Sequence, residues 1–217
     1  FISNFYSKTK FILRISGLPK FNFFRKNIWK ALSKNLHSVT CPTQGTKSQL
    51  LQLNMFKKNK IFLLEDPVLS LREIVKKRSE NIPFESGFIL GVGRLTHQKN
   101  FEFLIENFSK IQNEVKKKLI IIGSGENEDK LKKLISTNNA ENFIKIIGYQ
   151  DNVHKFYKKA DCFILTSRWE DPGFVLIEAA VNNVPILSCD SPNGPKDFKK
   201  DEVNGYAYRN NSKSEFR

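Results

Sequence analysis

The stretch that decides the fold is Ser167-Arg168-Trp169-Glu170-Asp171-Pro172-Gly173-Phe174-Val175-Leu176-Ile177-Glu178-Ala179-Ala180. It follows an apolar run, residues 161–166, which is typical of a buried parallel strand. Pro172-Gly173 predicts a turn, and residues 174–181 have the composition of a buried helix. We therefore expect Glu170 on the loop at the carboxyl end of the strand and Glu178 on the helix that follows.

The start of this helix is a predicted anion site. Backbone N–H groups near Gly173, Phe174 and Val175 begin the helix and have no carbonyl partner within it. Two carboxylates that flank such a helix end suit a ligand with hydroxyls at both ends and a diphosphate between them, which is the composition of a nucleotide sugar. The alternative is a pair of solvated surface charges, because glutamates at this spacing are common.

A second stretch, Gly91-Val92-Gly93-Arg94-Leu95-Thr96-His97-Gln98-Lys99-Asn100, continues from a predicted strand at residues 88–93. Glycine at the end of a strand allows the backbone to approach a phosphate, and Arg94 and Lys99 supply positive charge. Taken alone, these two side chains are more typical of a solvated surface than of a phosphate site, so they gain weight only together with the glutamate pair.

Two later strands end in residues that can border a nucleotide. Gly123 closes the strand at 119–122 and begins Gly123-Ser124-Gly125, but position 128 is Glu, so the dinucleotide pattern is incomplete and no such cofactor is expected. Tyr149 follows the strand at 143–147 and has two interpretations. Its ring either contacts a nucleotide base or packs as a half-buried aromatic.

From residue 88 onward, predicted strands alternate with predicted helices. The strands lie at 88–93, 119–122, 143–147, 162–165 and 185–189, and the helices at 100–116, 127–136, 153–159 and 174–181. Repeated strand–helix units predict an α/β fold with a Rossmann-like, doubly wound parallel sheet. Strands are also expected at 10–16, 38–41 and 60–64, with helices through 21–35 and 50–54 and a cap at Thr46.

The spacing Glu170-x7-Glu178 with Gly173 inside resembles the signature of retaining glycosyltransferases of family 4, which adopt the GT-B fold. Residues 93–100 resemble the family's Gly-Arg-Leu-x-x-x-Lys-Asn pattern, whose basic pair grips the donor diphosphate. The resemblance covers residues 38–210 and is strongest from 88 to 206. Asp197 stands where the family commonly has Glu, and Asp171-Pro172 replaces the commoner Gly-Phe.

The resemblance implies transfer of a hexose from a nucleotide sugar, above all a UDP-sugar, to a glycan or lipid-linked acceptor with retention of configuration. Such a reaction would serve the synthesis of cell-surface polysaccharide or glycolipid. The implied catalytic residues are Glu170, Arg94 and Lys99. The implied donor-binding residues are Gly93, Arg94, Lys99, Gly123, Tyr149, Glu170, Gly173, Phe174, Val175 and Glu178. The chain contains no Asp-x-Asp, so neither a metal nor a cofactor besides the substrate is expected.

The resemblance also implies a division of the chain. Residues 1–68 correspond to the last part of an amino-terminal, acceptor-side domain, residues 69–86 to an interdomain linker, and residues 87–217 to a nucleotide-sugar-binding domain that is truncated at its carboxyl end. We therefore expect a fragment with one nearly complete lobe and no turnover of its own.

The net charge of +14 is unevenly distributed. Residues 1–80 hold 16 Lys and Arg against four Asp and Glu, whereas residues 81–217 hold 20 against 18. The basic first part favours peripheral contact with an anionic membrane, and AT-rich codon usage is an alternative origin. No nucleic-acid-binding motif accompanies the charge, so nucleic acid is not an expected partner. Two rival functions remain: a GT-B nucleotide-sugar epimerase and a basic, non-enzymatic binding module.

The three cysteines, Cys41, Cys162 and Cys189, have neither a paired nor a metal-binding spacing, which predicts reduced, buried thiols. No signal peptide and no apolar run of about 18 residues is visible. The expected location is the cytoplasm, and peripheral attachment to the inner face of the membrane is the alternative that the basic first part favours.

Overall fold

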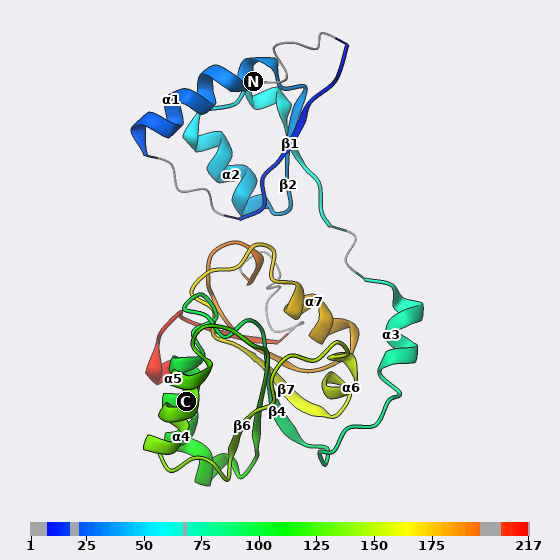
Figure 1. Cartoon of the computed structure of the whole chain (residues 1–217), viewed down its shortest axis with the longest axis vertical. Helices are drawn as coiled ribbons and strands as arrows, with labels where there is room; N and C mark the ends of the chain where they lie inside the picture. Colours follow the sequence, from blue (N-terminus) through cyan, green and yellow to red (C-terminus); the bar gives the residue numbers. More distant parts are fainter. Residues whose placement is uncertain (1–7, 18–21, 67–68, 196–204, 217) are drawn as a thin grey trace. The chain divides into compact units, whose positions relative to one another are not determined.

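The computed structural model describes the chain except for residues 1–7, 18–21, 67–68, 196–204 and 217 (Figure 1). The chain forms two compact units, one of Phe1–Pro67 with Glu170–Pro172, and one of Val68–Trp169 with Gly173–Arg217. The expected domain boundary at residue 68 lies outside the described residues. The expected linker, 69–86, groups with the second unit.

The first unit contains a parallel three-stranded sheet in the order β1-β2-β3. Its elements are β1 Ile12–Arg14, α1 Phe23–Leu32, β2 Ser38–Cys41, α2 Gln44–Leu53 and β3 Ile61–Leu63, with short 3-10 turns at Ser33–Asn35 and Lys58–Lys60. All four residues of β2 are buried because this strand is central. Val39, Leu50, Met55 and Ile61 form the small core around it.

Helix α2 begins earlier than the sequence indicates. Thr43, not Thr46, is the N-cap, and its hydroxyl accepts a hydrogen bond from the Thr46 backbone N–H at 3.1 Å. The predicted cap is wrong because Gln44 and Gly45 already form the first turn of the helix. Thr46 instead donates its hydroxyl to the Asp171 carboxylate at 2.7 Å, as Thr43 does at 3.0 Å.

The second unit contains a larger sheet, in the order β6-β5-β4-β7-β8-β9, in which all neighbouring strands are parallel. The strands are β4 Phe88–Val92, β5 Leu119–Ile122, β6 Ile144–Ile146, β7 Ala160–Leu165, β8 Ile186–Cys189 and β9 Tyr206–Tyr208. The helices are α3 Leu71–Lys77, α4 Phe101–Val115, α5 Glu128–Thr137, α6 His154–Tyr157, α7 Phe174–Val181 and α9 Lys213–Phe216.

Helices cover both faces of this sheet, as Figure 1 shows for α4 and α5 on one side and α6 and α7 on the other. The residues of β4 alternate between the two layers: Ile89 packs in the core with α4 and α5, and Leu90 in the core with α6 and α7. The sheet is thus doubly wound, as predicted. The chain runs outward from β4 through β5 to β6 and then returns to β7, so the strand order reverses between β4 and β7. Ligands of open α/β sheets bind outside the carboxyl ends of the strands at such a point.

Elements that the sequence did not indicate lie at the end of the second unit. Strand β9 pairs with β8, and its Tyr208 is 3% exposed and stacks against Phe103 of α4. Phe216 of α9 packs edge-on against the same two rings. All three cysteines are free, as expected, although Cys162 is only partly buried. Among the described residues, no helix is long and apolar enough to span a membrane.

Candidate functional site

Three loops of the second unit meet at the carboxyl edge of its sheet. The loop after β4 is bonded to the loop after β5 through Leu95 N–H to Ser124 O, at 2.9 Å, and Asn127 N–H to Leu95 O, at 2.9 Å. The loop after β5 is bonded in turn to the loop after β6 through Gly123 N–H to Gly148 O, at 2.9 Å. These backbone bonds fix the main chain at the edge before any ligand binds.

Two of the predicted glycines are needed because backbone and side chains approach closely there. A Cβ at Gly123 would lie 1.9 Å from the carbonyl oxygen of Gly93, a distance that no side chain tolerates. A Cβ at Gly93 would lie 2.9 Å from Cε of Lys99, so the aliphatic part of Lys99 crosses directly over this glycine. Both residues have positive φ, +149° and +154°, which also favours glycine.

Arg94 lies at the exposed side of the loop after β4. Its Nη2 is 3.4 Å from Oε1 of Gln98, and Gln98 Nε2 donates to the carbonyl of Trp169 at 3.0 Å. The backbone carbonyl of Gln98 also accepts from Arg168 N–H at 2.8 Å. Gln98 therefore joins the loop that carries Arg94 to the loop after β7, which the sequence identified as the second half of the site.

Lys99 is held between the same two loops. Its backbone carbonyl accepts a hydrogen bond from the hydroxyl of Thr166 at 3.0 Å, directly after β7. Burial raises the pKa of the Glu178 carboxyl, and the positive charge of Lys99 is close enough to oppose part of that rise. The structure thus brings together Lys99 and Glu178, two of the predicted site residues that are 79 positions apart in the sequence.

Glu178 is half-buried on α7, and its partner is Tyr157 of α6. The Tyr157 hydroxyl lies 3.3 Å from Glu178 Oε2 and 3.2 Å from the carbonyl oxygen of Val175, so it can donate to either. Burial raises the pKa of Glu178 above its ordinary value of 4.5, and the Tyr157 hydrogen bond and Lys99 oppose that rise. Burial, together with the Glu178 charge, raises the pKa of Tyr157 well above 10.0, so its hydroxyl remains a donor.

The amino end of α7 contains the predicted anion-binding amides. Gly173 precedes the helix with φ of +85°, and among the described residues no side chain caps this end. Phe174 is 39% exposed and Val175 is half-buried. The first amides of an α-helix have no carbonyl acceptor within the helix, so this end is available to an anion.

Glu170 and Tyr149 are placed differently from the residues above. Glu170 belongs to the first unit together with Asp171 and Pro172, and it is 4% exposed. Asp171 accepts hydrogen bonds there from the hydroxyls of Thr43 and Thr46 and from Gly17 N–H at 2.7 Å. Tyr149 is 69% exposed, so the interpretation that it packs as a half-buried aromatic is wrong and its ring is accessible. Asp197 lies outside the described residues.

Sequence reasoning missed Gln98 and Tyr157. Gln98 carried a usable signal, because it is a polar residue inside the quoted motif between Arg94 and Lys99. Tyr157 carried none, since it lies on a four-residue helix and reaches Glu178 only through tertiary packing. Among the described residues, no group of three or more His, Cys, Asp or Glu side chains is arranged to hold a metal ion.

Comparison with known proteins identifies the family of this chain. The model of the family described as glycosyl transferases group 1 matches residues 73–217, which include the whole edge described above. The chain belongs to this family. The family membership and the GT-B type α/β fold that the sequence predicted are therefore confirmed.

Two curated relatives show what share of a family member's length this chain covers. It is 32% identical to an uncharacterised glycosyltransferase of Methanocaldococcus jannaschii, over 91% of this chain and 52% of that protein. It is 27% identical to the Campylobacter jejuni enzyme named N-acetylgalactosamine-N,N'-diacetylbacillosaminyl-diphospho-undecaprenol 4-alpha-N-acetylgalactosaminyltransferase, over 93% and 56%. The chain spans about half the length of these relatives.

Solved structures of low sequence identity share the fold. The Anabaena protein HepE, solved in complex with UDP and glucose, superposes with a TM-score of 0.80 at 17% identity, over 98% of this chain and 61% of HepE. Staphylococcus aureus TarM, solved with UDP among its ligands, superposes with a TM-score of 0.78 at 23% identity, over 96% and 42%.

Proposed function

We propose that this chain carries the donor-binding part of a glycosyltransferase that moves a hexose from a UDP-sugar to a glycan or lipid-linked acceptor. The observation that carries the proposal is the convergence of Arg94, Lys99 and Glu178 on one edge of the second unit, beside the start of α7. This arrangement matches a nucleotide sugar. The two cations and the open helix amides suit its diphosphate, and the carboxylate suits its hydroxyls.

Each side chain has a proposed role. Arg94, Lys99 and the amides of Phe174 and Val175 bind the diphosphate, and they stabilise the negative charge that develops on it as the sugar departs. Glu178 accepts hydrogen bonds from the ribose hydroxyls, with Tyr157 holding its carboxylate in place. Glu170 orients the hydroxyls of the transferred sugar.

The remaining features of the proposal rest on relatives and on the family resemblance. Structures that share the fold contain UDP, and one contains glucose, which supports a UDP-hexose donor. Curated relatives include a Bacillus subtilis poly(glycerol-phosphate) alpha-glucosyltransferase and a Rhizobium meliloti glycosyltransferase of lipopolysaccharide core biosynthesis. These names support cell-surface polymer synthesis. Retention of configuration and independence of metal ions complete the proposal.

Titration of the purified chain with UDP tests it, first in buffer with excess EDTA and then with added Mg²⁺. We expect UDP to bind equally well under both conditions. UDP-glucose, titrated in a separate experiment, should bind as well. Binding that requires Mg²⁺ would contradict the metal-free donor site. Absence of UDP binding under both conditions, in a chain that is folded by circular dichroism, would contradict the proposal as a whole.

A further inference from the structure

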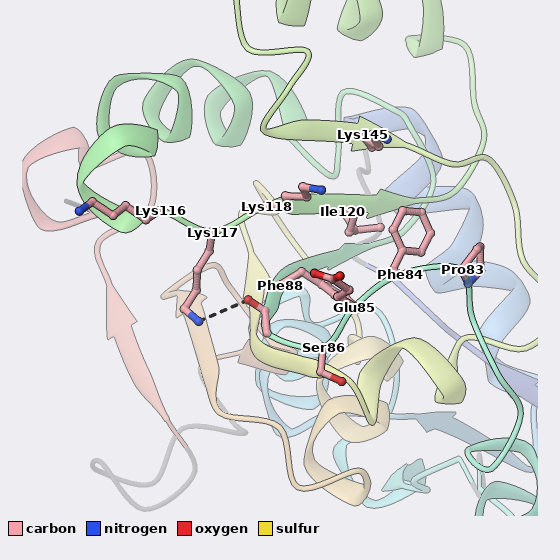
Figure 2. Close-up of a pocket in the computed structure, with 11 residues that line it drawn as sticks. Pro83, Phe84, Glu85, Ser86, Phe88, Lys116, Lys117, Lys118, Ile120 and Lys145 are labelled. Carbon is pink, nitrogen blue, oxygen red and sulfur yellow. Dashed lines mark hydrogen bonds between the residues drawn. The ribbon is translucent and has the colours of Figure 1, made fainter.

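A cavity of about 460 Å³ lies at the opposite edge of the six-stranded sheet, where the strands begin (Figure 2). Phe88 is the first residue of β4, and Lys118 immediately precedes β5. The segment 83–87 closes one side of the cavity. Every lining residue belongs to the second unit, and none belongs to the site described above.

The side chains that line this cavity combine an apolar floor with a basic rim. Phe84, Phe88 and Ile120 supply apolar surface and belong to or pack against the same core layer. The charged lining residues are Lys116, Lys117, Lys118, Lys145 and Glu85. Four cations against one carboxylate give the cavity a clear preference for anions.

The four lysines are not equivalent. Lys117 forms an ion pair with Asp161, and its ammonium group lies 3.3 Å from the carbonyl oxygen of Gly87. Figure 2 shows Lys116 pointing away from the other labelled residues. Lys118 and Lys145 remain, and within the described part of the chain neither forms an ion pair with a carboxylate. These two side chains therefore carry charge that a ligand can neutralise.

Strand register places Lys118 and Lys145 on one face of the sheet. Lys145 of β6 is paired with Ile120 of β5, and Lys118 is two residues before Ile120, so all three side chains project to the same side. Like charges on the same face of adjacent strands repel each other. An anion between the two ammonium groups would remove this repulsion. Glu85 is exposed, as both lysines are, so water screens all three charges alike and the two lysines leave the local charge positive.

We propose that this cavity is a second anion site, which binds a phosphate or diphosphate group between Lys118 and Lys145, with Phe84, Phe88 and Ile120 contacting an apolar part of the ligand. Such a group can come from a small phosphorylated metabolite or from the head group of an anionic lipid. The proposal does not depend on the donor site, because the two sites use opposite ends of the strands.

Binding of inorganic pyrophosphate tests the first source. The titration is performed on the chain saturated with UDP, so that the carboxyl edge is occupied. We expect the pyrophosphate affinity to fall about 10-fold or more in the double variant Lys118→Glu/Lys145→Glu, as for the loss of a charge-assisted contact. The charge-matched control is Lys110→Glu/Lys133→Glu, on exposed positions of α4 and α5. The variant Lys118→Arg/Lys145→Arg should retain binding.

Co-sedimentation with phosphatidylcholine vesicles that contain phosphatidylglycerol tests the second source. Residues 1–80 hold 16 Lys and Arg against four Asp and Glu, and this charge can also attract such vesicles. The informative quantity is therefore the difference between the two double variants. The site would be assigned to a lipid head group if vesicle binding fell more in Lys118→Glu/Lys145→Glu than in the control and the chain did not bind pyrophosphate. Pyrophosphate binding that depends on the same two lysines would assign it to a free phosphate.

Equal behaviour of the two double variants in both assays would overturn the proposal, whether or not UDP binds. UDP binding itself reports separately on the donor site. If UDP fails to bind while pyrophosphate binding still depends on Lys118 and Lys145, the second anion site stands and the donor proposal fails.

Discussion

At the carboxyl edge of the six-stranded sheet, Arg94 and Glu178 are bonded to neighbouring side chains, and the backbone of Lys99 is held by Thr166. At the amino edge, Lys118 and Lys145 project from neighbouring strands beside an open cavity, and no carboxylate of the described chain pairs with them. The side chains of the first edge are pre-organised by the protein. At the second edge, the two lysine charges are either hydrated by water or neutralised by a bound ligand. Both edges carry lysine or arginine side chains, so the presence of cations alone does not distinguish them.

The largest effect that this contrast predicts concerns glycine. Gly123→Ala at the carboxyl edge places a Cβ 1.9 Å from the Gly93 carbonyl oxygen, which requires the two loops to separate. We expect unfolding by urea to show a loss of about 3 kcal/mol or more, together with loss of UDP binding. Gly87→Ala at the amino edge is the control, since its Cβ has no contact closer than 3.5 Å. Its positive φ of +95° should cost only about 1–2 kcal/mol. Similar losses in both variants would mean that the carboxyl edge is not tightly packed.

The next effect separates the two glutamates. Glu170→Gln should leave the UDP affinity of the chain unchanged and reduce hexose transfer about 10²-fold in a full-length enzyme that contains this chain, because the lost contact stabilises the transferred sugar. Glu178→Gln should weaken UDP and UDP-hexose by similar factors, because both ligands contain the ribose. Calorimetric titration with UDP and with UDP-hexose distinguishes these patterns. Equal, small effects from both substitutions would show that the glutamates are surface charges without a role in the site.

Arg94→Ala tests whether charge at the carboxyl edge acts locally. The UDP affinity should fall about 10- to 100-fold, the loss expected for a charge-assisted contact of about 1.5–3 kcal/mol. Lys118→Ala at the other edge should leave the UDP affinity unchanged. A comparable loss in Lys118→Ala would indicate that UDP responds to the overall basic charge rather than to a defined site.

The smallest effect is a shift in pH dependence. Glu178 accepts more strongly from the ribose hydroxyls as a carboxylate than as a carboxylic acid, so UDP binding should be strongest above its raised pKa and weaken as the pH falls through it, at a pH above 4.5. Tyr157→Phe removes a hydrogen bond that lowers this pKa, so the pH at which binding is half-lost should rise. Glu178→Gln should remove the part of the pH dependence that Glu178 causes and leave only the part that belongs to the phosphates of UDP. An unchanged midpoint in Tyr157→Phe would exclude Tyr157 as the residue that positions Glu178.

The sequence predicted those parts of the molecule that depend on local pattern. Helix α7 has the predicted limits, 174–181, because its apolar composition follows directly after Pro172-Gly173. The pairing of Tyr157 with Glu178 was not predictable, since it requires the packing of α6 against α7. The capping of α2 by Thr43 was missed because two threonines three residues apart offer the same local signal. Strand β9 was missed because three residues, Tyr206–Tyr208, are too short to show a period.

The cavity at the amino edge was also absent from the sequence-based interpretation. Lys116-Lys117-Lys118 is visible as a basic run, but its relation to Lys145 depends on the pairing of β5 with β6. Residues that lie on one face of two strands are recognised only when the register is known. The residues of the carboxyl edge were easier to identify, because each follows a strand end that the hydrophobic pattern already marks.

The reversal of strand order at β4 has a consequence for how the chain folds. Leu90 pairs with Ile120, 30 residues away, and also with Phe163, 73 residues away. Contacts of large sequence separation form slowly because more chain must be ordered before they are gained. The half of the sheet with β4, β5 and β6 can therefore assemble early, with both glycine loops in contact. The half that brings Thr166, Trp169 and Glu178 to those loops assembles last, so binding competence should appear as a late kinetic event in refolding.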